Sequence, residues 1–216
     1  MKQLVLSLMV ATLFIGCTQN MVTGRKQLSL VSETELQTMA QQQYNSFLSE
    51  NKVVNASVNK DAEMVRRVGT RIASAITQYL QKEGKGDLLE GYKWEFNLID
   101  NKEVNAWCMP GGKVAFYTGI LPITKDETGL AVVMGHEIAH AVASHARERM
   151  SNGLLLNFGV GALSSAMGQN PTLTQQIFLQ SVGVGSQLGM LKFSRKHELE
   201  ADEMGLIFMA MAGYDP

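Results

Sequence analysis

Residues 135–149 read GHEIAHAVASHARER and carry His136, His140 and His145 within ten positions. On a helix, residues four apart are separated by about 400° of rotation and about 6 Å of rise, so His136 and His140 project from one face and can share one metal ion. Glu137 lies on the flank of that face. There it can contact a water bound to the ion without being a ligand, which is the geometry of the H-E-x-x-H zinc motif. The stretch therefore predicts a helix with a zinc site on one face.

A second segment offers the ligand that the histidine pair lacks. Catalytic zinc typically takes three protein ligands and keeps its fourth position for water. His145 lies five residues past His140, and the rotation of about 500° directs it away from the shared face. In SRKHELEADEMG at 194–205, Glu198 can bind the ion while Asp202, one turn later, accepts the N–H of a ligand histidine. The other candidates on this helix are His197 and two acids that we expect on a solvated face, Glu200 and Glu203.

Composition is typical of a single globular domain. The 216 residues are 45% hydrophobic, which is enough for one ordinary core. The 19 Lys and Arg residues are scattered and nearly balance the 20 Asp and Glu residues. This balance does not indicate a nucleic-acid-binding surface.

The first 16 residues form a separate unit. Lys2 precedes an apolar run over residues 4–15, which is typical of a secretory signal peptide and shorter than the ~20 residues of an ordinary membrane-spanning helix. The stretch ends LFIGC and resembles a bacterial lipoprotein signal, in which Cys17 becomes the lipidated first residue. Because Cys108 is the only other cysteine, lipidation leaves no disulfide pair, and we expect Cys108 to be buried. Residues 17–31 are predicted to be a tether.

Residues 32–216 are predicted to form the domain. Ser32 followed by Glu35 is a capping-box pattern, and Gly213 lies where a C-cap glycine belongs. Periodicity predicts helices over 32–49, 61–81, 127–150 and 195–211. Two-residue alternation and turn residues predict strands over 92–99, 103–110 and 113–119. The pattern indicates an α+β fold, mostly helical, with a small β-sheet beside the helix of the histidines.

Residues 153–191 are rich in glycine, alanine, leucine and methionine. The apolar run at 153–168 is about 16 residues long and contains Asn157, so a buried or loosely packed helical hairpin is predicted rather than a membrane span. The alternative is an apolar surface that faces lipid or substrate.

Three segments carry a family resemblance: NAWCMPGGKVAFYTGIL at 105–121, GHEIAHAVASHARERMS at 135–151 and SRKHELEADEMGL at 194–206. Together they resemble the CAAX prenyl protease and HtpX group of zinc endopeptidases, and specifically its soluble periplasmic lipoprotein branch, related to the mitochondrial OMA protease. The resemblance implies a zincin-like metallopeptidase domain with one Zn²⁺. The family's E-x-x-x-D element falls on Glu198 and Asp202, in agreement with the geometric choice, and His145 is implied to be structural.

The expected function is hydrolysis of peptide bonds in misfolded or mislocalised cell-envelope proteins. Glu137 would be the general base for the zinc-bound water, with His136, His140 and Glu198 as zinc ligands. The family's edge strand above the site, where an extended substrate adds by main-chain hydrogen bonds, would be formed by Lys113, Val114, Ala115, Phe116 and Tyr117.

The expected location is the bacterial cell envelope, with the lipid anchor in the outer membrane and the domain facing the periplasm. A second hypothesis is a metal-bound lipoprotein that acts mainly as a chaperone or binding module in outer-membrane protein assembly. It is based on one difference from the family's pattern: the sequence stops at AGYDP, whereas relatives continue with further helices and a histidine-proline segment.

Overall fold

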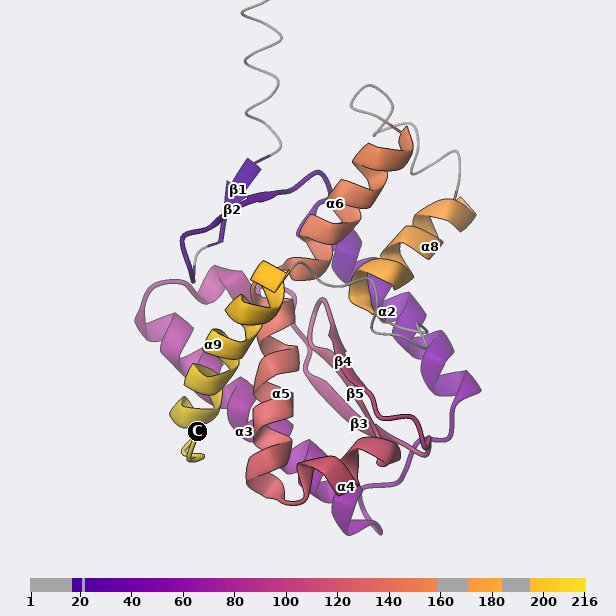
Figure 1. Cartoon of the computed structure of the whole chain (residues 1–216), viewed down its shortest axis with the longest axis vertical. Helices are drawn as coiled ribbons and strands as arrows, with labels where there is room; N and C mark the ends of the chain where they lie inside the picture. Colours follow the sequence, from indigo (N-terminus) through magenta and orange to yellow (C-terminus); the bar gives the residue numbers. More distant parts are fainter. Residues whose placement is uncertain (1–16, 21, 159–170, 184–194) are drawn as a thin grey trace, which may run out of the picture.

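The computed structural model describes residues 17–20, 22–158, 171–183 and 195–216. Figure 1 shows an α+β domain that is mostly helical, with one small sheet beside α5, which confirms the expected fold class. The described elements are β1 (Cys17–Gln19), β2 (Lys26–Leu28), α2 (Glu33–Glu50), α3 (Lys60–Lys82), η1 (Gly86–Leu89), β3 (Glu95–Ile99), β4 (Ala106–Met109), β5 (Lys113–Tyr117), η2 (Thr118–Ile120), α4 (Leu121–Thr124), α5 (Glu127–Val142), α6 (His145–Phe158), α8 (Pro171–Val182) and α9 (Arg195–Met211).

Local sequence signals fix the ends of the outer helices. The Ser32 side chain accepts a hydrogen bond from the Glu35 backbone N–H, and the Glu35 carboxylate accepts one from the Ser32 N–H, so the predicted capping box opens α2. At the other end of the chain, Gly213 has a φ of 78° and Tyr214 N donates to Met209 O, which closes α9. The apolar stripe of α3 is buried at Val65, Val68, Ile72, Ile76 and Leu80.

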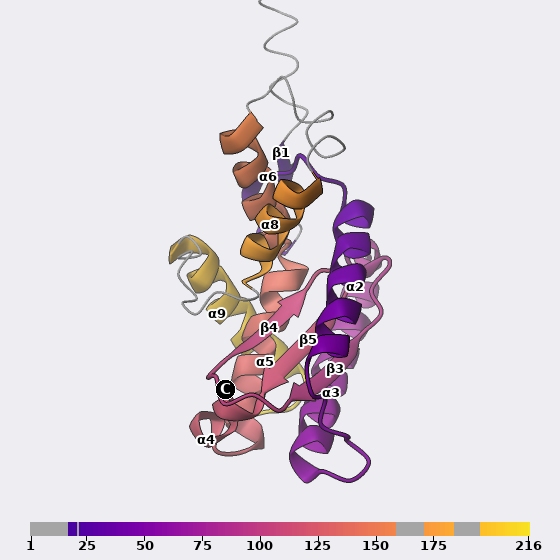
Figure 2. The ribbon, with the colours of Figure 1, turned by 90° about the vertical axis from the view of Figure 1, so that its right-hand side faces the viewer.

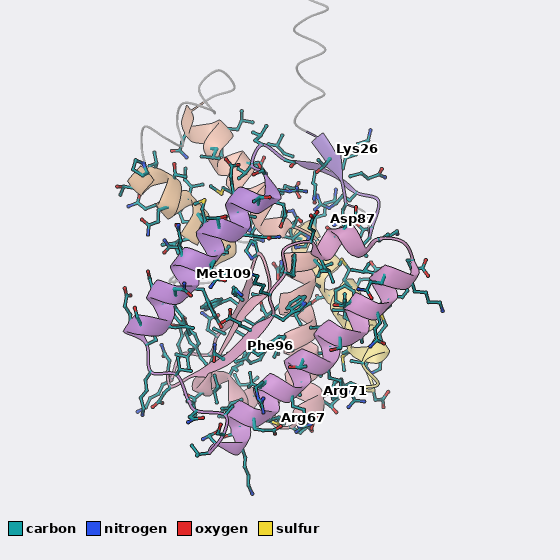
Figure 3. The ribbon with its side chains drawn as sticks, turned by 180° about the vertical axis from the view of Figure 1, so that it is seen from behind. Lys26, Arg67, Arg71, Asp87, Phe96 and Met109 are labelled. Atoms are coloured by element: carbon teal, nitrogen blue, oxygen red, sulfur yellow. The ribbon has the colours of Figure 1, made fainter. Side chains whose placement is uncertain are left out.

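Alternate side chains of the sheet enter two cores. The strand order is β3-β5-β4, with β3 parallel and β4 antiparallel to β5. Val114 and Phe116 pack with α3 and α5, whereas Ala115 and Tyr117 pack with α2, α6 and α8. Figure 2 shows the sheet between α5 and α2, and Figure 3 shows Phe96 between α2 and α3 from behind. Helices therefore cover both faces of the sheet, which accounts for the burial of every residue of β5.

The predicted edge strand is wrong in its position. Residues Lys113, Val114, Ala115, Phe116 and Tyr117 form β5, which is the central strand of the sheet. Its main chain is paired with β3 on one side and with β4 on the other, so no free edge is left for a substrate. Among the described strands, β4 pairs with β5 alone and is the edge next to α5.

The single helix predicted over 127–150 is broken. α5 ends at Val142 and α6 begins at His145, and between them Ser144 has a φ of 56°, in the left-handed region. A helix cannot continue through such a residue, so the chain turns there. His145 consequently opens a new helix, and its rotation cannot be extrapolated from His140.

The segment predicted to be a tether is folded. β1 and β2 form an antiparallel hairpin, in which Thr18 pairs with Gln27, and the Asn20 and Gln27 side chains are buried. Arg25 pairs with Glu148 of α6. The predicted signal peptide, residues 1–16, lies outside the described residues.

The helices α6 and α8 pack against each other, in agreement with the predicted hairpin. Their buried contacts come from Met150, Leu154, Ile177 and Phe178. The rest of the predicted hairpin, residues 159–170 and 184–191, lies outside the described residues. Within the described ranges, no helix combines the length and the apolar character that crossing a membrane requires.

A pair of glycines lets α5 and α9 touch through their backbones. A Cβ at Gly205 would lie 2.7 Å from His136 N, and a Cβ at Gly135 would lie 2.6 Å from Gly205 O. Real Cβ atoms do not approach backbone atoms so closely, so glycine is required at both positions. This contact lies beside His136 and brings α9 within reach of the histidines.

Candidate metal centre

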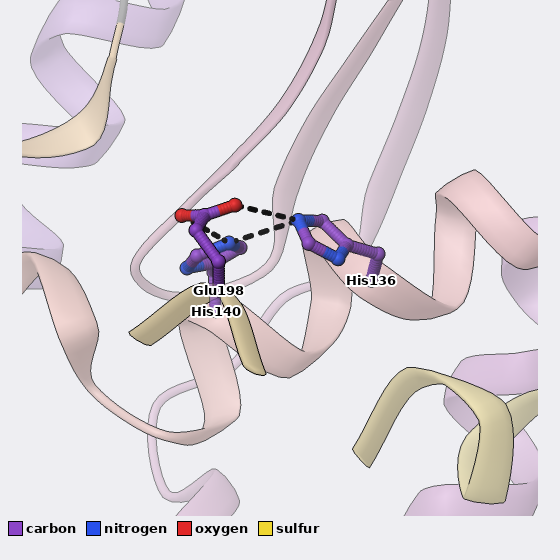
Figure 4. Close-up of side chains that lie close together, drawn as sticks. All are labelled: His136, His140 and Glu198. Carbon is purple, nitrogen blue, oxygen red and sulfur yellow. Dashed lines mark hydrogen bonds and ion pairs between the residues drawn. The ribbon is translucent and has the colours of Figure 1, made fainter. Parts of the chain in front are cut away.

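Three side chains from α5 and α9 converge on one point. The Nε2 atoms of His136 and His140 are 3.0 Å apart. The Glu198 carboxylate lies 3.6 Å from each, with Oε2 toward His136 and Oε1 toward His140. Figure 4 shows the three groups pointing toward one another, and their candidate ligand atoms all lie within 4.8 Å of each other. The structure thus brings together the three residues that the sequence singled out.

The arrangement fits a zinc ion. His136 Nδ1 lies 2.8 Å from the Asp202 carboxylate, which can only accept, so His136 donates there and its Nε2 is the nitrogen that faces the site. Glu198 Oε1 is buried and makes no hydrogen bond to any described residue. Nitrogen and oxygen lone pairs that face each other repel unless a cation lies between them. Two imidazoles and one carboxylate are a donor set of catalytic zinc sites.

The electrostatics of the site also favour a positive charge. Burial alone would lower the pKa of His136, but Glu198, Glu137 and Asp202 outweigh it and raise that pKa to about 9. Burial, with the neighbouring His145 and His136, lowers the pKa of His140. A single proton can therefore reside between the two rings, at the place a metal ion would take.

Glu137 lies in the same pocket as the candidate ligands. The pocket has a volume of about 510 Å³, and Ala106, Trp107 and Cys108 of the edge strand β4 form part of its wall. Burial raises the pKa of Glu137 to about 7, with His136 opposing and Glu198 adding to the shift. A carboxyl group tuned in this way can both accept and release a proton near neutral pH. Cys108 is buried, as expected.

The position of His145 beside a candidate ligand was not predicted from the sequence. His145 is fully buried, and its Nδ1 lies 2.8 Å from His140 Nδ1, so it contacts a candidate ligand. Burial lowers the pKa of His145, which keeps the ring neutral near pH 7.

Glu200 is buried, which corrects the expected solvated face, whereas Glu203 is exposed as predicted. The burial of Glu200 could have been inferred from its spacing. It lies four residues before Met204 and eight before Phe208, on the buried stripe of α9.

The remaining candidate third ligand, His197, is turned away from the metal centre. Its Nε2 lies 2.9 Å from the Glu148 carboxylate, and its ring stacks on that of His145. In contrast, Asp202 takes the position expected of it beside His136.

An H-E-x-x-H helix packed against a second helix that supplies a glutamate, beside a small sheet, defines a zincin-like metallopeptidase domain. Residues 59–216 match the model of peptidase family M48, and the chain belongs to this family.

Among its relatives is the mitochondrial metalloendopeptidase OMA1 of Schizosaccharomyces pombe, 34% identical over 196 residues, which are 90% of this chain and 53% of that protein. The OMA1 enzyme of Arabidopsis thaliana is 38% identical over 148 residues, 64% of this chain and 28% of the relative. The beta-barrel assembly-enhancing protease of Escherichia coli is 32% identical over 127 residues, 57% of this chain and 26% of the relative. The chain spans about half or less of the length of these proteins.

Proposed function

We propose that this chain is a zinc-dependent endopeptidase that cleaves misfolded or mislocalised proteins of the bacterial cell envelope. One observation carries the proposal: His136, His140 and Glu198 converge in a pocket that also holds Glu137 and is bordered by β4, which pairs with β5 alone among the described strands. A structural zinc site would be closed by a fourth protein ligand, whereas the part of the chain that the structure describes supplies these three and leaves a position for water.

His136, His140 and Glu198 would hold the ion. Zinc bound there would lower the pKa of its water toward ~7 and polarise the substrate carbonyl. Glu137 accepts the proton of the attacking water and delivers it to the leaving nitrogen as the peptide bond breaks. Asp202 holds the His136 ring in the tautomer whose Nε2 faces the site.

The substrate is proposed to bind as an extended chain along β4. Among the described residues no strand pairs with the outer edge of β4, which lies at the wall of the pocket, so a peptide can add there through main-chain hydrogen bonds. Such binding recognises an extended backbone more than particular side chains. It suits substrates that have lost their fold.

The proposed location is the periplasmic side of the outer membrane, with a lipid on Cys17. The sequence of residues 1–17 supports the anchor, and the E. coli relative, by its name a beta-barrel assembly-enhancing protease, supports an envelope role. Metabolic labelling with a fatty-acid analogue should mark the wild type and fail in Cys17→Ala.

Cleavage of an unfolded protein tests the function. The wild type and Glu137→Gln are compared for zinc content and for cleavage of a reduced, unfolded casein substrate, with Glu203→Gln as the control. We expect full zinc in all three and a loss of cleavage of about 10²- to 10⁴-fold in Glu137→Gln alone. Equal cleavage by the wild type and Glu137→Gln would refute the proposed endopeptidase activity. Suppression of substrate aggregation without cleavage by the wild type would favour the chaperone hypothesis instead.

A further inference from the structure

His145 connects a candidate ligand to a buried charge cluster. Its Nδ1 lies 2.8 Å from His140 Nδ1, and its Nε2 lies 3.0 Å from Glu200 Oε2. The positive φ at Ser144 turns the chain so that His145 comes back against His140. Both ring nitrogens of a fully buried histidine are therefore engaged, one on each side.

The directions of these hydrogen bonds follow from Glu200. This carboxylate pairs with Arg25 at 2.7 Å, so it carries no proton to donate. His145 must therefore donate to it from Nε2, which leaves Nδ1 of the neutral ring as an acceptor. His140 in turn donates from its Nδ1, and its Nε2 is left with a lone pair directed toward His136 and Glu198.

The residues that hold Glu200 come from the N-terminal hairpin and its turn. Arg25 Nε donates to Oε2, while Thr23 Oγ1 and Asn20 Nδ2 donate to Oε1, the latter at 3.3 Å. Arg25 also pairs with Glu148, whose carboxylate contacts His197. The segment directly after Cys17 is thus built into the surroundings of the metal centre.

We propose that His145 is a positioning residue that fixes the ring and tautomer of His140 for metal binding, and that Glu200, held by Asn20, Thr23 and Arg25, fixes His145. The inference rests on the proposed zinc site. It gives each ligand histidine an Nδ1 partner: exposed Asp202 for His136 and buried His145 for His140. A histidine ligand whose outer partner is lost typically binds its metal about 10- to 100-fold more weakly.

The test measures zinc affinity by competition with a chromophoric chelator in the wild type, His145→Phe and His145→Asn. In the wild type the ring centroids of His145 and His197 are 4.4 Å apart. Phenylalanine keeps a ring at this position but offers no hydrogen bond. Asparagine places an amide oxygen near the position of Nδ1 and can still accept from His140. We expect a 10- to 100-fold loss of zinc affinity in His145→Phe and a clearly smaller loss in His145→Asn.

Three further measurements keep the inference falsifiable. The visible spectrum of the Co²⁺-loaded protein should change in His145→Phe, because the His140 ring is reoriented. On α9, Glu200→Leu should weaken zinc binding and the exposed Glu203→Leu should not. If His145→Phe does not fold by circular dichroism, His145→Gln replaces it. Its amide reaches Glu200 but not His140, so it should bind zinc more weakly than His145→Asn.

Zinc affinity equal to that of the wild type in His145→Phe, or equal in His145→Gln and His145→Asn, would overturn the inference and leave the proposed function intact. Failure of the wild type itself to bind zinc would overturn both.

Discussion

The glycine contact between α5 and α9 makes a prediction against helix propensity. Alanine is a better helix former than glycine. If there were room for a Cβ at position 205, Gly205→Ala in the middle of α9 would stabilise the helix by about 1 kcal/mol. In the structure the backbone of Gly135 and His136 fills the space that this Cβ would need. We therefore expect the substitution to destabilise the protein and to disturb the metal centre.

The distances give the magnitude. The added Cβ would lie 2.7 Å from His136 N, 2.9 Å from His136 Cα and 3.0 Å from Gly135 C, whereas ordinary contact begins near 3.4 Å. Because all three are backbone atoms, α9 must move by about 0.7 Å. Overpacking of this kind costs about 1–3 kcal/mol, which outweighs the gain in propensity and leaves a net loss of about 1 kcal/mol. The same movement carries Glu198 away from the histidines and should weaken zinc binding on the order of 10-fold.

The assay is urea unfolding of the metal-free protein together with a zinc competition titration. The pair Glu203→Gly and Glu203→Ala, at an exposed position of the same helix, measures the propensity difference without the contact. We expect alanine to be the more stable member at 203 and the less stable at 205. If Gly205→Ala were stabilised like the control, or bound zinc as the wild type does, the close contact would not hold the centre together.

Two further predictions concern the stability of the fold. Tyr44 is buried, donates to Val114 O at 2.9 Å and accepts from Asn97, so Tyr44→Phe should cost about 1–3 kcal/mol in urea unfolding; a cost near zero would show that these bonds contribute little. Burial opposes ionisation of Glu148, but His197 and Arg25 outweigh it and hold its pKa below the usual 4.5. A lowered folded pKa gives stability that is present above pH ~4.5 and lost as pH falls through the folded pKa, so Glu148→Gln should flatten the acid loss of stability. An unchanged acid slope would contradict this.

Much of the fold could be predicted because the signals are local. The capping box at Ser32, the apolar stripe of α3 and Gly213 each act within one or two turns of helix, and the structure has them where the sequence indicated. Strand order depends on pairing between distant segments, which period-two alternation does not encode. The edge position of β5 was implied by the family resemblance alone, and it is wrong because both β3 and β4 pair with this strand. The break at Ser144 carries no glycine or proline to mark it.

The grouping of the candidate ligands on each helix could also be predicted from local signals. Residues four apart share a helix face, which placed His136 with His140 and Glu198 with Asp202. The contact of His145 with Glu200 could not be predicted, because it requires the turn at Ser144 and the packing of the N-terminal hairpin, whose Asn20 contacts Ala143 across 123 residues of sequence. A charged residue on the buried stripe of α9 was the available signal.

Zinc content after dialysis against a mild chelator tests the central claim most directly. The wild type, Glu198→Ala and Glu203→Ala differ in one carboxylate on the same helix, and Glu203 is exposed and away from the site. We predict about one zinc per chain in the wild type and in Glu203→Ala, and far less in Glu198→Ala. Retention of a full zinc ion by Glu198→Ala, with wild-type affinity, would contradict the account.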